Sequence, residues 1–145
     1  MKIQEIMSKN PIHISPVESV AVAARTLAQY NIGILPVCKS DGRLCGLITD
    51  RDLVTRCVAA GKDPSQTTVR EIMTGQITSV KPDMEVNVAA HLMGRQQVRR
   101  LPVVNDGKLC GIVSLGDLAK RDETVMDAAD VLTDITDNLS QRDYW

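Results

Sequence analysis

The chain has 145 residues, a formal net charge of −1, and a composition that is 43% hydrophobic and 24% charged. A chain of this length can bury enough apolar surface to fold alone, as one domain or as two closely joined halves. The near-neutral charge gives no long-range attraction to nucleic acid or anionic lipid. With no Phe, two Tyr and one Trp, the chain also lacks a stacking platform for single-stranded nucleic acid, so we expect no nucleic-acid partner.

The cellular location of the protein is predicted from the absence of membrane-spanning and signal segments in the sequence. There is no apolar run of about 18 residues and no N-terminal signal segment, so we expect no membrane association and a cytoplasmic location. No Cys-x-x-Cys pair occurs, and we interpret all the cysteines as reduced core thiols, namely Cys38, Cys45, Cys57 and Cys110. The alternative is a Cys38–Cys45 bridge across the Asp41-Gly42 hairpin, although disulfides are rare in the cytosol.

In chain order, the first half predicts alternating helices and strands. Val20, Ala23 and Leu27 recur on one helical face, and Asp41-Gly42 signals a hairpin. The expected elements are a short helix (3–8), a strand (12–15), a helix (19–31), two strands (34–39 and 44–49) and a helix (50–60). A strand, a helix and another short apolar strand imply a βαβ unit followed by a hairpin, and therefore an α/β (α+β) fold.

The second half repeats the first. Residues 3–8 return as 69–74, an offset of 66, and one residue lost near Lys39-Ser40 changes the offset to 65. Leu35-Pro36-Val37, for example, matches Leu101-Pro102-Val103. Such a repeat predicts pseudo-two-fold symmetry. The expected organisation is repeat 1 (1–60), a linker (61–68), repeat 2 (69–121) and a C-terminal helical tail (122–145).

One motif recurs at the same place in both repeats. Gly46-Leu47-Ile48-Thr49-Asp50-Arg51-Asp52 returns as Gly111-Ile112-Val113-Ser114-Leu115-Gly116-Asp117, each time between a buried strand and a helix. A helix N-terminus favours anions and oxygen-rich ligands. Asp52 lies on the same face as Thr49, and its carboxylate can accept hydrogen bonds from both hydroxyls of a ribose. Gly46 permits a close approach to the backbone.

A simpler interpretation of the motif is structural. Thr-x-x-Asp is also a variant of the helix capping box, which needs no ligand. Two copies at equivalent positions of a repeat favour a shared ligand function over an accidental cap. Both interpretations remain open at the level of sequence.

Signs of catalysis or metal binding are lacking. His13 and His91 fall at unrelated positions, and the chain has no phosphate loop, dinucleotide fingerprint, zinc-protease or nucleophile-elbow motif. Histidine and cysteine do not occur at metal-ligand spacing. We therefore expect no enzyme, no required cofactor and no metal site.

These features resemble a cystathionine-β-synthase (CBS) domain pair, or Bateman module. Ile-Met near the start of each repeat, Leu-Pro-Val before the hairpin, and Gly-h-h-Thr/Ser-x-x-Asp after it carry the resemblance over residues 1–121. The chain is also similar to small stand-alone bacterial CBS proteins of the hypoxic response protein type. The resemblance implies tandem β-α-β-β-α repeats whose clefts bind adenosine compounds such as AMP, ADP, ATP, NAD or S-adenosylmethionine.

The resemblance also implies two sites, each completed by the other repeat. In the first, Thr49 and Asp52 would bind the ribose, with further contacts from Ile77, Thr78, Val98, Arg99 and Arg100. In the second, Ser114 and Asp117 would be joined by Pro11, Ile12, Ile32, Gly33 and Ile34. Relatives are commonly homodimers, which we expect here together with an unidentified protein target.

Charge distinguishes the two expected sites. Arg99 and Arg100 stand where relatives can place phosphate-binding residues, and Arg51 could add a third positive charge. We hypothesise that the Thr49/Asp52 site is the tighter one. The alternative is that Arg99 and Arg100 are ordinary solvated arginines.

The tail after residue 121 lies outside the repeat. Ala128, Leu132, Ile135 and Leu139 form an apolar stripe at helical spacing, followed by Tyr144 and Trp145. This amphipathic helix must bury its stripe on its own domain or on a partner. The expected function is a regulatory module that senses an adenosine nucleotide; the alternative is a dimerising scaffold without a ligand.

Overall fold

The computed structural model describes residues 1–140, with side chains up to residue 137. Tyr144 and Trp145, and the side chain of Leu139, lie outside the described residues. By contacts the chain divides into two compact units, which we name after the repeat that supplies most of each. The first-repeat unit comprises Pro11–Ile77 and Asp106–Leu109, and the second-repeat unit comprises Met1–Asn10, Thr78–Asn105 and the chain from Cys110. The pseudo-two-fold relation between the repeats stays a prediction.

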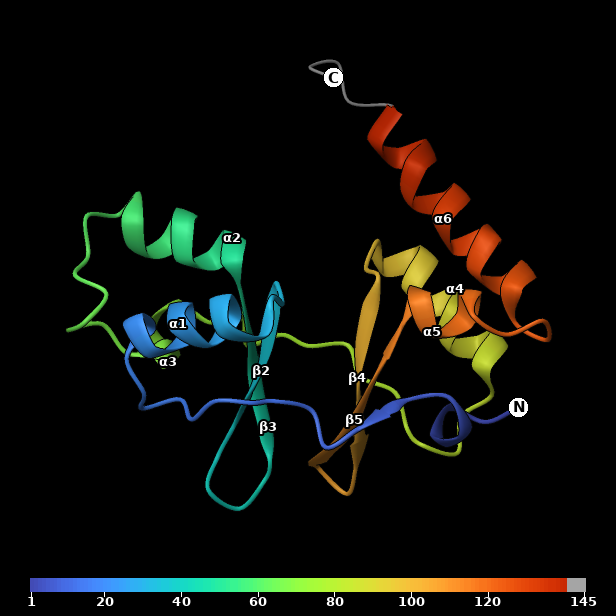
Figure 1. Cartoon of the computed structure of the whole chain (residues 1–145), viewed down its shortest axis with the longest axis horizontal. Helices are drawn as coiled ribbons and strands as arrows, with labels where there is room; N and C mark the ends of the chain where they lie inside the picture. Colours follow the sequence, from blue (N-terminus) through green and yellow to red (C-terminus); the bar gives the residue numbers. More distant parts are fainter. Residues whose placement is uncertain (141–145) are drawn as a thin grey trace. The chain divides into compact units, whose positions relative to one another are not determined.

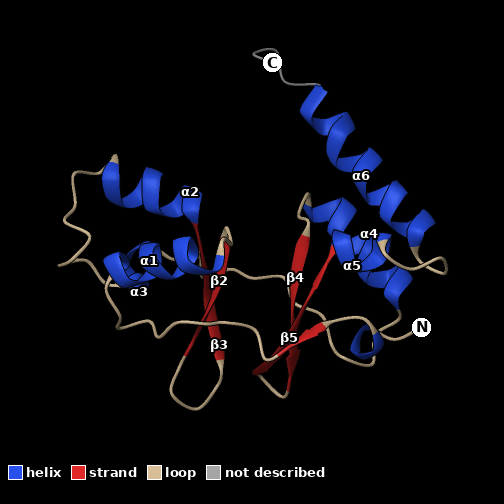
Figure 2. Ribbon diagram, in the orientation of Figure 1, coloured by secondary structure: helices blue, strands red, loops and turns tan. Residues whose placement is uncertain are grey.

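The first-repeat unit packs helices against a two-stranded sheet (Figures 1 and 2). The Ser19 side chain accepts a hydrogen bond from the Val22 N–H at the start of its first helix, and Asn31 ends that helix in the left-handed conformation. Its elements are α1 (Val20–Tyr30), β2 (Ile34–Cys38), β3 (Leu44–Thr49), α2 (Asp50–Asp52), the helix η2 (Leu53–Val58) and α3 (Val69–Ile72).

The second-repeat unit repeats this plan with a third strand and a long final helix (Figures 1 and 2). Its sheet has the order β1-β5-β4. The elements are η1 (Ile3–Glu5), β1 (Ser8–Lys9), α4 (Val86–Gln96), β4 (Arg100–Asn105), β5 (Lys108–Ser114), α5 (Leu115–Ala119) and α6 (Val125–Ser140). The mixed α/β fold and the C-terminal helix expected from the sequence are confirmed.

Three predicted elements differ from the structure. The short helix expected at 3–8 is a 3₁₀ helix over Ile3–Glu5, and Ser8 begins the strand β1. The strand expected at 12–15 is a single parallel bridge between Ile14 and Val37, and Pro16, two residues later, has no N–H to extend a ladder. The helix expected over 50–60 begins at Asp50, but its main part is a π-helix in which the Ala59 N–H donates to the Val54 carbonyl at 2.8 Å.

The segment that leads into each repeat packs on the strand of the other repeat. Strand β1 pairs antiparallel with β5, with Lys9 opposite Gly111. In the first-repeat unit, Leu47 and Thr74 exchange backbone hydrogen bonds of 2.9 and 2.8 Å. Repeat boundaries in the sequence therefore follow the duplication, whereas the compact units follow contacts between segments far apart in the chain.

Each unit has its own hydrophobic core. In the first-repeat unit the core includes Val20, Leu35, Ile48 and Ile72, and in the second-repeat unit it includes Ile3, Met93, Leu101, Val113 and Leu118. The leading segments contribute Ile3 to one core and Ile72 to the other, which shows that they are part of the units they join. No helix among the described residues is long and apolar enough to cross a membrane.

Helix α6 packs on α4 and α5 of its own unit. Its buried residues are Ala128 and Val131, with Ile135 partly buried against the same core. Leu132, which the sequence placed on the apolar stripe, is 55% exposed. The buried face is therefore centred on Val131, and α6 leaves apolar side chains at its margin.

Candidate ligand-binding site

Each repeated motif forms a complete capping box at a strand-to-helix junction. The Asp52 N–H donates to Thr49 Oγ1 at 3.1 Å, and the Thr49 N–H donates to Asp52 Oδ2 at 3.0 Å. In the second copy the corresponding distances between Asp117 and Ser114 are 3.1 and 2.8 Å. Both motifs therefore form the capping box, which uses one oxygen of each carboxylate, and the ligand interpretation stays a prediction.

The first carboxylate is the more enclosed. Asp52 is 7% exposed, and its Oδ1 lies 3.7 Å from Nε of Arg56. Nη1 of Arg56 donates to the carbonyls of Ile72 and Met73 at 3.2 Å each. Asp117 is partly exposed.

Arg56 and its counterpart Arg121 were missed by the sequence analysis. Nη2 of Arg121 donates to the Glu5 carbonyl at 3.2 Å, so both arginines bond the leading segment of their unit. The signal was available: each motif Asp is followed by Arg four residues later, a spacing that places the two side chains on one helical face.

The motif glycines admit the leading segments. A Cβ on Gly111 would lie 2.9 Å from the Ser8 carbonyl oxygen and 2.6 Å from Sδ of Met7. A Cβ on Gly46 would lie 3.1 Å from the Thr74 carbonyl oxygen and would collide with Sδ of Met73. The close approach to the backbone expected at Gly46 therefore exists, and it is made by Met73 and Thr74 of the same protein chain.

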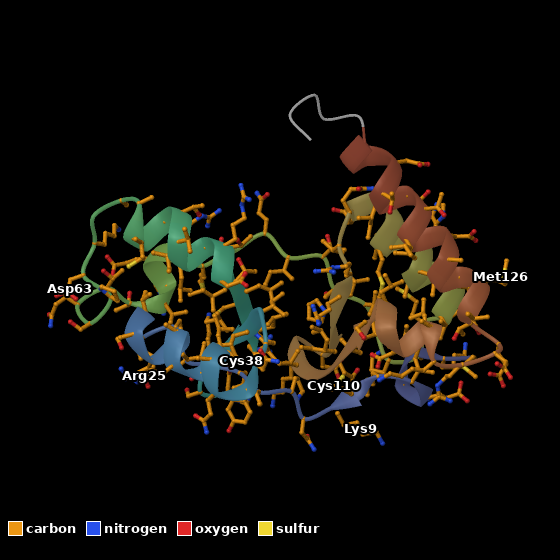
Figure 3. All side chains as sticks on the ribbon, turned by 45° about the horizontal axis from the view of Figure 1, so that its top comes forward. Lys9, Arg25, Cys38, Asp63, Cys110 and Met126 are labelled. Atoms are coloured by element: carbon orange, nitrogen blue, oxygen red, sulfur yellow. The ribbon has the colours of Figure 1, made fainter. Side chains whose placement is uncertain are left out.

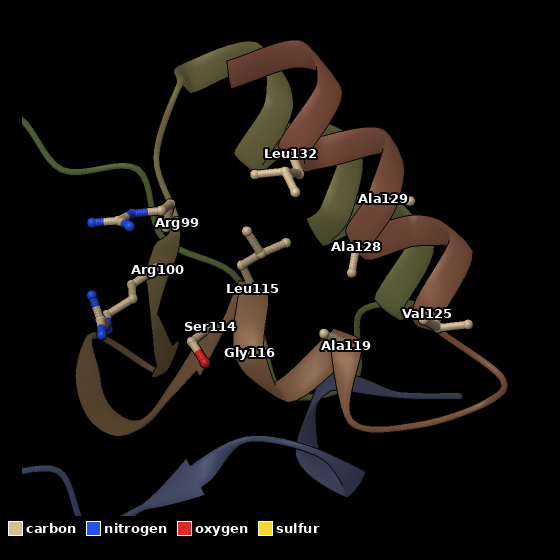
Figure 4. A pocket seen from close by; sticks show the side chains of 10 residues that line it. All are labelled: Arg99, Arg100, Ser114, Leu115, Gly116, Ala119, Val125, Ala128, Ala129 and Leu132. Atoms are coloured by element: carbon tan, nitrogen blue, oxygen red, sulfur yellow. The ribbon is translucent and has the colours of Figure 1, made fainter. Parts of the chain in front are cut away.

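Arg99 precedes β4 and Arg100 begins it, beside the second motif. The Leu115 N–H donates to the Arg99 carbonyl at 2.8 Å, as the Asp50 N–H donates to Gly33 at 3.1 Å in the first repeat. A pocket of about 490 Å³ opens here and brings both arginines together with Ser114 (Figure 4). Its lining consists of Arg99, Arg100, Ser114, Leu115, Gly116, Ala119, Val125, Ala128, Ala129 and Leu132.

The other predicted site residues belong to both units. Thr49, Arg51, Asp52 and Ile77 lie in the first-repeat unit, as do the residues expected to complete the second site, Pro11, Ile12, Ile32, Gly33 and Ile34. Thr78, Val98, Arg99, Arg100, Ser114 and Asp117 lie in the second-repeat unit. Each expected site draws on both units, so its assembly stays a prediction. The expected contact of Arg99 and Arg100 with a ligand bound at Thr49 and Asp52 also stays a prediction.

All four cysteines are free thiols, as predicted. Those of Cys45 and Cys110 donate to the carbonyls of Val37 and Val103 at 3.4 and 3.3 Å. Cys38 and Cys110 lie in the first-repeat and second-repeat units respectively (Figure 3). Burial, reinforced by the neighbouring Cys45, raises the pKa of the Cys38 thiol to about 11. Among the described residues, no three His, Cys, Asp or Glu side chains gather as a metal ion would require.

The CBS domain family model matches residues 3–59 and 69–124, and the chain therefore belongs to the CBS domain family. Among curated proteins, it is 38% identical over 134 residues to the CBS domain-containing protein YhcV of Bacillus subtilis, covering 92% of this chain and 94% of that protein. Hypoxic response protein 1 of Mycobacterium tuberculosis is 35% identical over 117 residues, covering 81% of this chain and 82% of the relative.

Solved structures of CBS proteins share this fold. Hypoxic Response Protein I with two coordinated zinc ions superimposes with a TM-score of 0.77 at 33% identity, over 83% of this chain and 98% of that one. The CBS domain pair of MJ0100, in complex with 5′-methylthioadenosine and S-adenosyl-L-methionine, gives 0.72 at 31% identity, over 83% and 94%. CBSX2 in complex with AMP gives 0.73 at 26% identity, over 86% and 98%.

Proposed function

We propose that this protein is a regulatory module that binds an adenosine-containing compound at its two repeated motifs. The observation that carries the proposal is the motif itself: a carboxylate held at a helix N-terminus, twice, in a family whose members bind AMP and S-adenosylmethionine. AMP, ADP, ATP, NAD and S-adenosylmethionine are the candidate ligands. The compound acts as a regulatory ligand and undergoes no reaction.

The capping geometry allows the two oxygens of each carboxylate to have different roles, one in the cap and one in ligand binding. Oδ2 of Asp52 and Oδ2 of Asp117 hold the backbone N–H of the capping residue. An ionised carboxylate has a second oxygen and spare lone pairs, which can accept from the two hydroxyls of a ribose. Helix capping and ribose binding are therefore compatible at the same side chain.

Each proposed site is completed by the other repeat. Thr49, Arg51 and Asp52 are joined by residues from the start of the second repeat and from the loop before its Leu-Pro-Val sequence. Ser114 and Asp117 are joined by the corresponding residues of the first repeat, Pro11, Ile12, Ile32, Gly33 and Ile34. A ligand that bridges the repeats can shift the conformation only by its difference in affinity for the two states. The output passes through a homodimer or a separate protein target in the cytoplasm.

A dimerising scaffold without a ligand is the competing function. The completeness of both capping boxes favours it, because a cap alone explains the residues at positions one and four of each box. The two functions differ in what a change at Asp52 or Asp117 does to ligand binding.

The test is a thermal-unfolding panel with the five candidate compounds on the wild type, Asp52→Asn and Asp117→Asn. Asparagine keeps an oxygen that can accept the capping N–H but removes the charge and the second acceptor. A ligand at 100 times its dissociation constant adds about 2.7 kcal/mol, which raises the midpoint by about 5–10 °C. We expect one compound to produce this shift and the Asn variants to reduce it.

If none of the compounds shifts the midpoint of the wild type, the scaffold function is favoured and the nucleotide proposal fails. A shift that persists unchanged in both Asn variants would place the ligand elsewhere and would also contradict the proposal.

A further inference from the structure

Arg56 joins the first motif to the segment that leads into the second repeat. Its Nε lies 3.7 Å from Oδ1 of Asp52, and its Nη1 donates to the carbonyls of Ile72 and Met73 at 3.2 Å each. Both carbonyls lie at the end of α3, where the carbonyls of a helix lack partners within the helix. One guanidinium therefore contacts the motif carboxylate and the backbone of a segment sixteen and seventeen positions further along the chain.

The contact with Arg56 leaves Asp52 able to bind a ligand. Oδ2 of Asp52 accepts from the Thr49 N–H within the capping box. At 3.7 Å, Oδ1 and Arg56 form an ion pair rather than a hydrogen bond, so the lone pairs of Oδ1 remain for the hydroxyls of a ribose. The side chain of Asp52 is 10% exposed and that of Arg56 is 50% exposed. Because half of the arginine is open to water, its position depends on both of its protein contacts.

The segment that Arg56 holds has little support from the sheet. Thr74 forms a single bridge with Leu47, and residues 75–79 form no helix or strand. Strand β1, which leads the other unit, instead pairs with β5 over two residues. The hydrogen bonds from Arg56 are therefore a larger share of what fixes residues 72–77, the last residues of the first-repeat unit before the chain enters the other unit.

The second repeat lacks this connection. Nη2 of Arg121 donates to the Glu5 carbonyl at 3.2 Å. The ion pairs among the described side chains, however, include Asp52–Arg56 and none between Asp117 and Arg121. The link from motif carboxylate to leading segment therefore belongs to the first motif.

We propose that Arg56 is a positioning residue that couples occupancy of the first motif to the order of residues 72–77. This inference rests on the proposed function, because it is the ribose of the proposed ligand that Asp52 binds. Hydroxyls bound to Oδ1 fix the carboxylate, the carboxylate fixes the guanidinium, and the guanidinium holds the two carbonyls. The segment runs on to Ile77, one of the residues expected to complete this site. By linkage, order in the segment favours the ligand as much as the ligand favours order.

The first test is calorimetric titration of the full chain in an Asp117→Asn background, which weakens the second motif. AMP, ADP, ATP, NAD and S-adenosylmethionine are each titrated into this parent and into its Arg56→Met variant. A coupling of typical size predicts that Arg56→Met weakens the compound that binds by at least about fivefold. The matched control is Arg70→Met, which removes the same charge from an exposed position of α3 and should change the affinity by less than roughly twofold.

Hydrogen exchange separates positioning from a purely structural role. The Thr74 N–H donates to the Leu47 carbonyl at 2.8 Å, next to the carbonyls that Arg56 holds. The Lys39 N–H donates to the Arg43 carbonyl at 2.9 Å, at the hairpin of the same unit, and serves as the reference. We expect the compound that binds, at saturation, to slow exchange at Thr74 at least about fivefold more than at Lys39 in the parent, and equally at both in Arg56→Met.

Binding that Arg56→Met leaves unchanged, or that Arg70→Met weakens equally, would overturn the role of Arg56 and leave the proposed function standing. Equal slowing at Thr74 and Lys39 in the parent would do the same, as would a difference that persists in Arg56→Met. Compounds that bind the wild type but not the parent would also overturn the inference, because the first motif then takes no ligand. Failure of all five compounds to bind the wild type would overturn both proposals.

Discussion

The two repeats share a backbone arrangement and differ in the side chains around it. Both motifs close the same capping box with distances within 0.2 Å of each other. Around the first box lie Asp50, Arg51 and the Asp52–Arg56 ion pair, whereas the second box lies beside Leu115, Arg99, Arg100 and α6. The hydrogen bonds that close the capping box are thus the same in both copies, whereas the side chains around the box differ between them.

The largest expected difference concerns the motif glycines. Gly111→Ala would press a Cβ against the Ser8 backbone, whereas Gly46→Ala would press mainly against the flexible Met73 side chain. We expect Gly111→Ala to lower the free energy of unfolding by about 2–3 kcal/mol and Gly46→Ala by about 1–2 kcal/mol, measured by urea denaturation. Gly116→Ala is the control, because its Cβ would meet only Ser114 Oγ at 3.6 Å. Equal losses at Gly46 and Gly111 would contradict the distinction.

The next largest expected difference between the repeats is in how their stability depends on alkaline pH. The pKa of the Cys38 thiol is raised from 9.0 to about 11 by burial, and Val104 occupies the matching position of the second repeat. The unfolded chain loses this proton near pH 9 and the folded chain keeps it, so stability present below pH 9 falls as pH rises toward 11. We expect a loss on the order of 2 kcal/mol from this group, measured from denaturation midpoints.

Cys38→Val copies the residue of the second repeat and provides the matched comparison. It should flatten the part of the alkaline stability profile that belongs to Cys38. A profile of the same slope in Cys38→Val would assign the loss to other groups.

Removing the caps tests the feature that the repeats share. Thr49→Ala and Ser114→Ala should each cost about 1 kcal/mol, because each leaves the third N–H of its helix without the hydroxyl acceptor. Equal costs in thermal or urea unfolding would confirm that the boxes are energetically alike. A cost at one site more than twice that at the other would show that surroundings outweigh the cap.

The smallest expected effect is at Arg56. Arg56→Met should cost about 0.5–1 kcal/mol, because its guanidinium is half exposed and the ion pair with Asp52 is therefore screened. The control is Arg121→Met, which removes a single hydrogen bond to the Glu5 carbonyl. High salt should reduce the cost of Arg56→Met more than that of Arg121→Met. An identical response to salt would show that Arg56 acts through its carbonyl contacts alone.

Local signals made much of this fold predictable. Ser19 and Asn31 mark the ends of α1, and Asp41-Gly42 separates strands whose bounds match the prediction within one residue. The repeat also identified the two junction motifs and the family. Contacts between distant segments could not be predicted from local sequence patterns. They include the pairing of β1 with β5, the burial of Val131 in place of Leu132, and the pocket lined by Arg99 and Ser114. Helical spacing defines a stripe, but the neighbour that α6 meets decides which edge of the stripe is buried.

The crossed placement of the leading segments separates the unit of duplication from the unit of folding. Cutting the chain at the linker would separate Met7 from Gly111 and Met73 from Gly46. Each half would then lose the leading segment that packs on its strands. Two copies of one half could complete each other by domain swapping, in which the first ten or so residues of each copy pack on the strands of the other. Joining two repeats in one polypeptide places both leading segments in the same chain as the strands and cores they complete.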